Sequence, residues 1–409
     1  DCGGYRVKSM KELKFYASQG IKSAIIAKKL SQNELSTLYN DLRSFGYDDI
    51  KIFTLLSENE SKIKDISIED LLARKPKDLD KEIIKNYINS KIILITGAGG
   101  TIGSELCKLC LEFGAKKLIM LDHSEYNLYA INEATNADER NVLALIDICN
   151  QKDLERIISA HRPDIVFHAA AYKHVPLCEY NAISAVKNNV LGTKNLIDLA
   201  IKYAINRVVL ISTDKAVRPT NVMGATKRIC ELYALNSSSH TTQITGVRFG
   251  NVLGSSGSVI PKFQAQIAKN QALSVTHPQI TRYFMLKSEA CELVLQAGSI
   301  ARGGELFVLD MGEPVKIADL AKRILELSGK ENLGINYIGL RPGEKLYEEL
   351  LIDPKDAKTR FESIFVTHSK PCDLKSLNEK ISLLLSFDEA NESFFKTLKD
   401  IVPEFNHAK

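Results

Sequence analysis

The sequence lacks any apolar run that approaches the roughly 18 to 20 residues needed to span a bilayer, and no signal peptide opens it. We therefore expect the chain, as given, to be soluble. Its first residues are Asp1-Cys2-Gly3-Gly4, without an initiator Met. That start is compatible with a fragment of a longer protein and leaves an upstream membrane anchor open.

A sustained block of basic residues is also absent. The formal net charge of +4 is spread along the 409 residues, as expected for lysines on solvated helix faces. Nucleic-acid binding therefore has little support. With 44% hydrophobic and 25% charged residues, the chain is long enough for a large core and for more than one domain.

The chain has eight cysteines, but their scattered positions do not suggest a disulfide framework. Most lie inside apolar patterns, which is typical of reduced core thiols in a cytoplasmic protein. Cys107 and Cys110 form a Cys-x-x-Cys within a helical pattern, without a second pair at zinc-ribbon spacing, so core packing is favoured over metal or redox chemistry. His174 and Cys178 are four residues apart, but without further ligands they favour substrate contact or packing. We expect no metal.

The N-terminal part predicts a small, incomplete α/β unit. Residues 21–54 contain a short apolar run, a helical pattern and a strand-like piece, too few elements to bury both faces of a sheet. Residues 57–88 are polar, and a Lys- and Asp-rich segment around Arg74 to Lys81 predicts a linker.

A regular alternation of strands and helices begins at Lys91. Strand-like runs at 91–96, 117–121, 141–146 and 164–170 are separated by helical patterns, and further strands at 207–212 and 243–252 flank a helix that holds Lys227. A long helix is expected from Ile183 to Tyr203. Elements of these lengths predict a doubly wound parallel sheet of at least six strands. Beyond Asn251, mixed elements and Gly- and Ser-rich turns predict a smaller cap over the ligand crevice.

The strand at 91–96 (KIILIT) runs directly into Gly97-Ala98-Gly99-Gly100-Thr101-Ile102-Gly103, and a helical pattern follows. Glycine at 97, 100 and 103 allows a tight turn, close backbone approach to a pyrophosphate and close helix packing. The first helical residues, Thr101 and Ile102, supply amide donors at the positive end of the helix dipole. This arrangement predicts a dinucleotide-binding turn rather than a merely structural one.

Asp122 ends the second strand of the alternating region, where a carboxylate can accept hydrogen bonds from the adenosine ribose and repel a 2′-phosphate. It therefore predicts NAD rather than NADP. The alternative is that Asp122 caps the helix that starts near Ser124. Residues after the next two strands complete the predicted cofactor site: Asp147 and Ile148 beside the adenine, and Ala169 and Ala170 as a floor without bulky side chains.

The stretch from Val209 to Lys227 carries the candidate chemistry. A buried strand breaks at Ser212 and exposes Thr213, Asp214 and Lys215 beside one another. A hydroxyl, a carboxylate and an amine at the carboxyl end of a strand are suited to proton transfer. The structural alternative is an Asp N-cap beside a solvated Lys.

The glycine spacing, HAAA at 168–171, Asn188-Asn189 and Ser212-Thr213 resemble the extended short-chain dehydrogenase/reductase superfamily. The resemblance covers roughly Lys91 to Glu349 and implies an NAD(P) cofactor and a Tyr-x-x-x-Lys pair. Lys227 keeps the second half of that pair, which holds the nicotinamide ribose, and Met223 replaces the Tyr. The two side chains share a helix face. Since Met cannot carry a proton, we expect Thr213, directly or through water, to deprotonate the sugar hydroxyl; a Tyr from elsewhere is the alternative.

The triplet Thr213-Asp214-Lys215 resembles that of nucleotide-sugar 4,6-dehydratases. Four further matches resemble their capsule and flagellin-glycosylation branch: YKHVP (172–176), VRPTN (217–221), FGNVLGSSGSV (249–259) and RPGEKL (341–346). With Met223, the pattern is most similar to the UDP-N-acetylglucosamine 4,6-dehydratases of the bacillosamine pathway for protein glycosylation. The expected reaction oxidises C4, eliminates water across C5 and C6 and returns hydride to C6. Lys215, kept neutral by desolvation or by the cofactor charge, is the predicted base, and a protonated Asp214 is the predicted acid.

By the same resemblance, UDP-sugar contacts come from Lys173, His174, Asn251, Arg341 and Glu344, with Arg248 and Arg282 as weaker candidates. The fork of the Arg341 guanidinium suits a diphosphate, although a surface Arg in a turn is the alternative. The fold class that follows is α/β, a Rossmann-type parallel sheet of the extended short-chain kind. Its segments are a partial α/β domain and linker (1–88), the NAD-binding core (89–250), mainly a substrate-binding cap with core-completing elements (251–370), and C-terminal helices (371–409).

The resemblance also implies a homo-oligomer on the cytoplasmic face of a membrane, with an N-terminal membrane domain preceding the partial α/β domain. The apolar helices after Asn181 and around Lys227 are the usual dimer faces of the superfamily, although helices buried within one chain have the same pattern. Two rival functions stay open: a UDP-sugar 4-epimerase, which needs no acid and base for elimination, and an NAD-bound scaffold without catalysis.

Overall fold

The computed structural model describes residues 12–28, 30, 32–57, 60–66, 70, 78–349, 357–368 and 371–407. The chain divides into two compact units, Asp1–Lys75 with Lys322–Gly334, and Pro76–Ala321 with Ile335–Lys409. The first half of the predicted linker segment, residues 74–77, lies outside the described residues.

The first unit contains the expected order of strand, helix and strand. β1 (Ser23–Ile26) pairs in parallel with β2 (Asp49–Ser57), and α2 (Gln32–Phe45) connects them after a short α1 (Leu13–Ser18). Leu35 and Leu42 of α2 are buried against Ile26 and Ile50 of the two strands. An antiparallel third strand, β3 (Glu60–Asp65), was not predicted, because its sequence ESKIKD has a single apolar residue.

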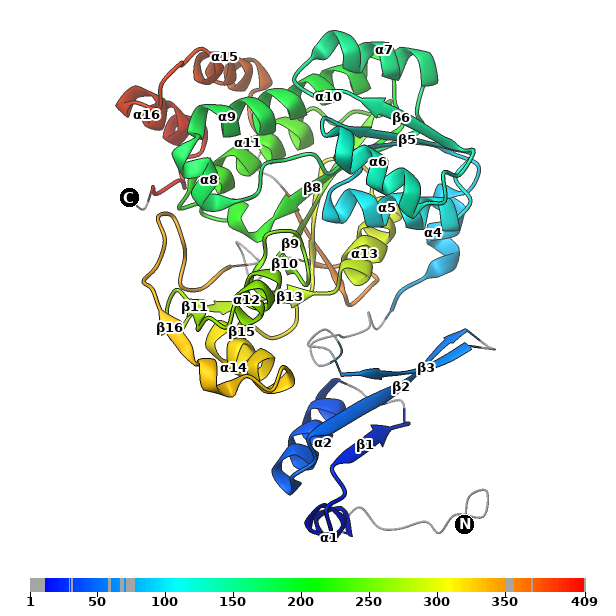
Figure 1. The fold of residues 1–409 in the computed structure, drawn as a ribbon. Helices are drawn as coiled ribbons and strands as arrows, with labels where there is room; N and C mark the ends of the chain where they lie inside the picture. The colour runs from blue at the N-terminus through cyan, green and yellow to red at the C-terminus, as the bar shows by residue number, and fades with distance from the viewer. Residues whose placement is uncertain are drawn as a thin grey trace. The chain divides into compact units, whose positions relative to one another are not determined.

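The second unit is built on a nine-stranded sheet in the order β17-β18-β14-β9-β8-β7-β4-β5-β6 (Figure 1). The strands from β14 to β6 are parallel, and β18 and β17 pair antiparallel at one end. This arrangement confirms the predicted doubly wound sheet. Its bounds are β4 Ile92–Thr96, β5 Lys117–Asp122, β6 Asn141–Leu145, β7 Ile165–His168, β8 Arg207–Thr213, β9 Gln243–Phe249, β14 Glu305–Leu309, β17 Ala357–Lys358 and β18 Ile364–His368.

Helices cover both faces of this sheet, which is why the central strands read as continuous apolar runs. One face is packed by α4 Lys81–Ile88, α5 Thr101–Glu112, α6 Glu125–Ala134 and α13 Lys287–Ile300. The other is packed by α7 Gln151–His161, α8 Val175–Tyr180, α9 Ala182–Val186, η2 Lys187–Leu191, α10 Gly192–Lys202, α11 Val222–Asn236, α15 Leu374–Leu385 and α16 Glu392–Ile401. The segment from α9 to α10 matches the long helix expected there and contains a π-helical turn at η2.

α4 begins at Lys81, where the segment predicted as a linker ends, and it was not predicted as a helix. Asp80 caps the helix by accepting hydrogen bonds from the backbone amides of Glu82 and Ile83, and Ile84 and Ile88 are fully buried in the core. Ile83 and Tyr87 are partly buried against the same core. The polar residues of the helix suggested a solvated segment from composition alone. Cys107 and Cys110 of α5 are free, fully buried core thiols, as expected.

The smaller elements after β9 form three two-stranded sheets with helices beside them. These are β10 Asn251–Val252 with β13 Phe284–Met285, β11 Leu273–Val275 with β16 Ile335–Tyr337, and β12 Thr281–Arg282 with β15 Val315–Lys316, together with α12 Val259–Ala268 and α14 Ile317–Leu327. In the part of the chain that the structure describes, no helix is long and apolar enough to cross a membrane.

The C-terminal helices pack on the helix that carries Lys227. Leu377 and Ile381 of α15 and Phe394 and Leu398 of α16 share a core cluster with α11, and Figure 1 shows both helices beside α9 and α11. Thirteen residues of α11 are buried in this way within one chain. The apolar pattern of α11 is thus accounted for without a second subunit, and the homo-oligomer stays a prediction.

Candidate active site

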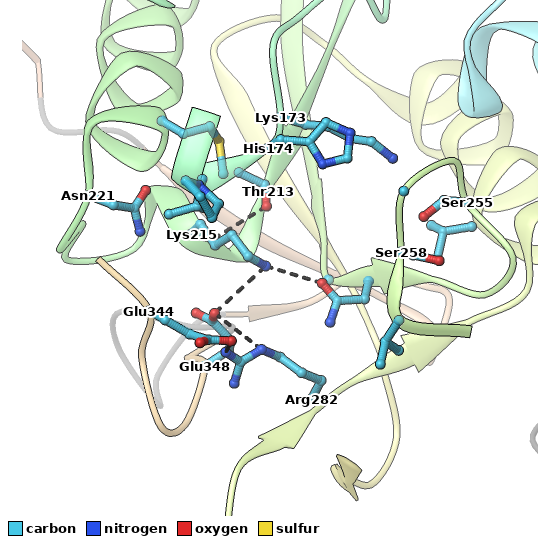
Figure 2. A pocket seen from close by; sticks show the side chains of 18 of the residues that line it. Lys173, His174, Thr213, Lys215, Asn221, Ser255, Ser258, Arg282, Glu344 and Glu348 are labelled. Carbon is cyan, nitrogen blue, oxygen red and sulfur yellow. Dashed lines mark hydrogen bonds and ion pairs between the residues drawn. The ribbon is translucent and has the colours of Figure 1, made fainter. Parts of the chain in front are cut away.

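A cavity of about 380 Å³ opens at the carboxyl ends of the parallel strands. Its walls come from the residues that follow β7, β8 and β9, from the start of α5 and α11, and from the cap. The chain enters the sheet at β4, runs outward through β5 and β6, and returns to β7 on the other side of β4. Such a reversal of strand order creates a ligand crevice at the carboxyl edge of the sheet. Figure 2 shows polar side chains converging there from separate segments.

The glycine-rich turn after β4 has the close packing that the sequence predicts. Gly97 has a φ of +65°, and a Cβ there would lie 2.8 Å from the Cα of Ala170. A Cβ on Gly103 would lie 2.0 Å from the carbonyl oxygen of Gly97. Gly100 supplies the N-cap of α5 without a side chain, so a ligand can approach the first amides of the helix. The turn therefore fits a dinucleotide pyrophosphate, and Thr101 lines the cavity beside it.

Asp122 is buried at the end of β5 and supports the glycine-rich turn. Its Oδ2 accepts a hydrogen bond from the Gly99 amide at 3.0 Å, and its Oδ1 accepts one from the Ser124 amide at 3.0 Å. Ser124 itself is the N-cap of α6, since its hydroxyl accepts from Asn127. The capping alternative for Asp122 is therefore wrong, and its predicted contact with the ribose stays a prediction.

The other predicted cofactor residues differ in their placement. Ile102 and Ala169 line the cavity, and Ala170 lies against the glycine-rich turn. Asp147 is exposed and accepts a hydrogen bond from the Cys149 amide. Ile148 is buried in the core against Gly192 of α10. The adenine contact predicted for Asp147 and Ile148 stays a prediction.

Met223 and Lys227 both line the cavity from α11, as their spacing of four residues predicts. Lys227 is 5% exposed, and burial lowers the pKa of its ammonium group. Tyr172 also lines the cavity, from the segment after β7. Among the described cavity residues, Tyr172 is therefore the candidate for the alternative in which a Tyr from another segment deprotonates the sugar hydroxyl.

Asp214 and Lys215 lie in a 3₁₀ turn directly after β8, with Thr213 as its N-cap. The Lys215 Nζ donates to Asp214 Oδ1 at 3.0 Å, and the Thr213 hydroxyl donates to the same oxygen at 2.8 Å. The Asp214 and Lys215 side chains thus form an ion pair at the strand end. The tight turn and the long Lys215 side chain bring the ammonium group back onto its neighbour.

The charge of Lys215 also differs from the prediction. Burial is the largest influence and lowers the pKa of Lys215, but the negative charges of Asp214 and Glu348 outweigh it and raise that pKa above its usual value. Lys215 is therefore a protonated ammonium group in this structure, and desolvation does not keep it neutral. A role as base requires that a neighbouring carboxylate first takes its proton.

Most predicted substrate residues meet at the cavity (Figure 2): Lys173, His174, Asn251, Arg282, Arg341 and Glu344. Asn251 Oδ1 accepts from Lys215 Nζ at 3.2 Å, and Glu344 lies 3.4 Å from Arg282 and 3.2 Å from Arg341. Lys173 is close enough to Lys215 that, after burial, the charge of Lys215 further lowers its pKa.

Arg248 does not line the cavity. It is 1% exposed and is bound to Glu231 of α11 through two hydrogen bonds, at 2.7 and 2.5 Å. Ser212 donates to the same carboxylate at 2.6 Å. This predicted substrate contact is therefore replaced by a buried ion pair that joins β8, β9 and α11, because Arg248 faces inward from a strand that is covered on both sides.

Two charged cavity residues were missed by the sequence analysis. Glu348 lies 3.7 Å from Lys215 Nζ and 3.7 Å from Arg282 Nε, and its side chain is 3% exposed. Lys262 of α12 lies near Arg341, whose charge, after burial, lowers the pKa of Lys262. The acidic YEEL after RPGEK was a possible signal for Glu348, whereas Lys262 is one lysine among many in the sequence.

The fold and the site together define an extended short-chain dehydrogenase/reductase: a parallel sheet, a glycine-rich turn after β4, and Lys227 on α11, the helix that follows β8. The chain belongs to the polysaccharide biosynthesis protein family, whose family model matches residues 93–369.

Three similar proteins support this assignment. The chain is 48% identical to the capsular polysaccharide biosynthesis protein CapD of Staphylococcus aureus, over 81% of the chain but 58% of that protein, so it spans little more than half of this relative. It is 36% identical to a UDP-glucose 4-epimerase of Rickettsia canadensis, over 70% of the chain and 85% of that protein. Among solved structures, Pen from Bacillus thuringiensis is 37% identical with a TM-score of 0.66, covering 70% of the chain and 91% of Pen.

Proposed function

We propose that the protein is an NAD-dependent UDP-N-acetylglucosamine 4,6-dehydratase, which forms a UDP-2-acetamido-2,6-dideoxy-4-hexulose for glycan biosynthesis. The observation that carries this proposal is the Asp214–Lys215 pair, hydrogen-bonded at 3.0 Å beside the cavity that Lys227 lines. Elimination of water needs an acid and a base at adjacent carbons, which a hydride transfer alone does not.

NAD fits the described residues at the glycine-rich turn, where the N-cap Gly100 leaves the first amides of α5 open to a pyrophosphate, and at Lys227, which would hold the nicotinamide ribose. Bound there, NAD supplies a hydride acceptor for C4 and a hydride donor for C6. Everything else in the reaction is proton transfer and orientation by the side chains of the chain itself.

The first proton to move is that of the C4 hydroxyl. Thr213 Oγ1 accepts it and passes its own proton to Asp214 Oδ1 through the existing 2.8 Å hydrogen bond. This relay does the work of the Tyr that Met223 replaces. It leaves Asp214 protonated as the hydride leaves C4. Asp214 thus acquires the proton that it needs as an acid.

The second step is elimination. The C4 ketone acidifies the C5 proton, which a neutral Lys215 amine removes, while protonated Asp214 donates to the departing C6 hydroxyl. Hydride return to C6 is then accompanied by transfer of the Lys215 proton back to C5. The C4 hydroxyl proton leaves in the water, and Asp214 returns to a carboxylate.

The diphosphate of the nucleotide sugar would bind beside Lys262 and Arg341, two cations that lie close enough to affect each other. An anion between them relieves their repulsion, and the Arg341 guanidinium can bind phosphate oxygens in a bidentate manner. Lys173, His174 and Asn251 then face the sugar from the opposite strands.

A UDP-sugar 4-epimerase is the alternative that a specific observation favours, because a relative with 36% identity carries that name. The Asp214–Lys215 pair argues against it, since epimerisation needs neither group, and it argues equally against an inactive NAD-bound scaffold. The test is incubation of the protein with NAD and UDP-N-acetylglucosamine, followed by mass spectrometry. A product lighter by one water supports the dehydratase, an isomer of unchanged mass supports the epimerase, and unaltered substrate supports the scaffold.

The family resemblance further supports a homo-oligomer at the cytoplasmic face of a membrane. Size-exclusion chromatography with light scattering tests the oligomer, and fractionation of cells that make the full-length protein tests the location.

A further inference from the structure

Glu348 is a second carboxylate near the Lys215 ammonium group, in addition to Asp214. Its Oε1 is 3.7 Å from Lys215 Nζ, and Figure 2 shows the carboxylate between Lys215 and Arg282. Lys215 therefore has two carboxylates within ion-pair distance. The proposed reaction gives a role to Asp214 but none to Glu348.

The second oxygen of Glu348 is a buried atom without a hydrogen-bond partner among the described residues. A buried carboxylate oxygen left unpaired is costly, so such an atom indicates a partner that is bound in another state. This oxygen is Oε2, whereas Oε1 is the oxygen that faces Lys215, so a proton on Oε2 would break no contact that the structure describes.

The proposed reaction needs a group that accepts a proton from Lys215. Lys215 begins as an ammonium group, but elimination needs its amine. Asp214 cannot take this proton once Thr213 has delivered the C4 hydroxyl proton to it. Protonation of Asp214 also removes the negative charge nearest to Lys215, which lowers the pKa of the Lys215 ammonium group.

We propose that Glu348 accepts the surplus proton of Lys215 when Asp214 becomes protonated, and that it returns this proton at the end of each turnover. This inference rests on the proposed dehydratase function. The N–H bond of Lys215 breaks as the Glu348 O–H bond forms, and the amine then takes the C5 proton. After Lys215 reprotonates C5, Glu348 gives the stored proton back, so no net proton enters or leaves.

Two cations lie beside the Glu348 carboxylate. Lys215 and Arg282 both face it at 3.7 Å, and Arg282 is shared with Glu344 at 3.4 Å. Asp214 and Lys173 both lie close enough to Lys215 for their charges to interact with its own. A shift of about 1 Å by Lys215 brings the 3.7 Å separation to that of a charge-assisted hydrogen bond. Glu348 acts through Lys215 and is therefore a positioning residue that stores a proton, with no contact to C5 or C6 required.

The test compares Glu348→Gln with Glu349→Gln. Glu349 is the adjacent residue, is 43% exposed and pairs with Arg218 on the surface, so its substitution is a matched control. Reduced cofactor is followed by absorbance in single-turnover experiments, and the dehydrated product by mass spectrometry. For Glu348→Gln we expect normal C4 oxidation, accumulation of reduced cofactor and elimination slower on the order of 10²-fold. Glu349→Gln is expected to match the wild type.

The pH profile separates storage of a proton from an electrostatic role. Without Glu348, Lys215 must release its proton to water, so elimination by Glu348→Gln is expected to accelerate with rising pH while the wild type changes little. A purely electrostatic Glu348 raises the pKa of Lys215, so its removal would leave elimination unchanged or faster at neutral pH. That outcome overturns the inference.

Glu348→Asp is the second variant, for use if Gln disturbs folding. It keeps a titratable carboxyl group but draws it back by one methylene, so we expect slower elimination with unchanged C4 oxidation. Equal elimination rates in the Asp variant and the wild type contradict the inference. Absence of a dehydrated product from the wild type itself instead contradicts the proposed function, so the two failures are distinguishable.

Discussion

The Nζ of Lys215 lies 3.0 Å from Oδ1 of Asp214, its neighbour in the sequence, and 3.2 Å from Oδ1 of Asn251 after the next strand. The proposed acid and base are thus an ion pair at rest. In the proposed reaction both charges change: Asp214 gains the C4 hydroxyl proton through Thr213, and Lys215 gives its own proton to Glu348. Substitutions at the pair therefore separate the steps of the reaction.

Asp214→Asn and Lys215→Ala are expected to fail at different stages. Asp214 takes part before and during elimination, so Asp214→Asn is expected to slow C4 oxidation as well as dehydration. Lys215→Ala removes only the C5 base and is expected to accumulate reduced cofactor and the C4 ketone. Each change is expected to lower product formation by about 10²- to 10⁴-fold. The absorbance of the reduced cofactor and the mass of the product measure both effects. Normal turnover in either variant would contradict the roles of Asp214 as acid and Lys215 as base.

Thr213→Val tests the relay from the C4 hydroxyl to Asp214. The change keeps the shape of the side chain but removes the oxygen that donates to Asp214 at 2.8 Å. We expect C4 oxidation slower on the order of 10²-fold in single-turnover absorbance measurements. Thr213→Ser is the control and should retain the rate. If Thr213→Val oxidises C4 normally, Tyr172→Phe becomes the next variant to examine.

Lys227→Met is expected to weaken cofactor binding. Lys227 lines the cavity from a nearly buried position, and Met fills a similar volume without the ammonium group that would hold the nicotinamide ribose. We expect NAD affinity to fall about tenfold, which corresponds to about 1.4 kcal/mol, in a calorimetric titration. Lys202→Met changes an exposed lysine and is the control. Unchanged affinity in Lys227→Met would place the ribose elsewhere.

Gly103→Ala is expected to disturb the glycine-rich turn. Its Cβ would lie 2.0 Å from the carbonyl oxygen of Gly97, so the turn or α5 must move. We expect a loss of stability of about 1 to 3 kcal/mol together with weaker NAD binding, from denaturation and calorimetric titration. Ser104→Ala, at the next position of the same helix, should leave both quantities close to those of the wild type. Equal NAD affinity in Gly103→Ala would argue against a pyrophosphate at this turn.

Arg248→Met is expected to destabilise the fold rather than to affect substrate binding directly. It leaves the fully buried Glu231 with Arg228 at 3.1 Å as its described cation, at a cost of about 3 kcal/mol. Arg218→Met removes an exposed pair and is expected to cost about 0 to 1 kcal/mol. Denaturant titration measures both variants.

The stability lost in Arg248→Met is expected to depend on pH. Burial raises the pKa of Glu231, but Arg248 and further partners outweigh burial and lower that pKa. A depressed folded-state pKa contributes stability that is present above the unfolded value of about 4.3 and is lost as the pH falls through the folded value. The deficit of Arg248→Met should therefore be largest above about pH 4.3 and should shrink as the pH falls below it, because a protonated Glu231 needs no cation. A deficit independent of pH would indicate lost packing alone.

Local patterns predicted the elements whose formation depends on neighbouring residues. The run KIILIT before Gly97 has the apolar continuity of a strand covered on both faces, and β4 confirms it. The spacing of Met223 and Lys227 placed both side chains on one helix face, and both line the cavity. By contrast, α4 was missed because its two buried residues, Ile84 and Ile88, gain their stability from a core that the local sequence does not reveal.

The sequence by itself determined that Thr213, Asp214 and Lys215 stand at the carboxyl end of a parallel strand beside a dinucleotide turn, because alternating strands and helices fix which strand ends share an edge. Only the tertiary structure decided that Lys215 is charged, that Glu348 lies next to it, and that Arg248 is buried on Glu231. Charge state and pairing depend on the burial of the groups and on the distances between groups that are far apart in the chain. Neither quantity can be read from the sequence.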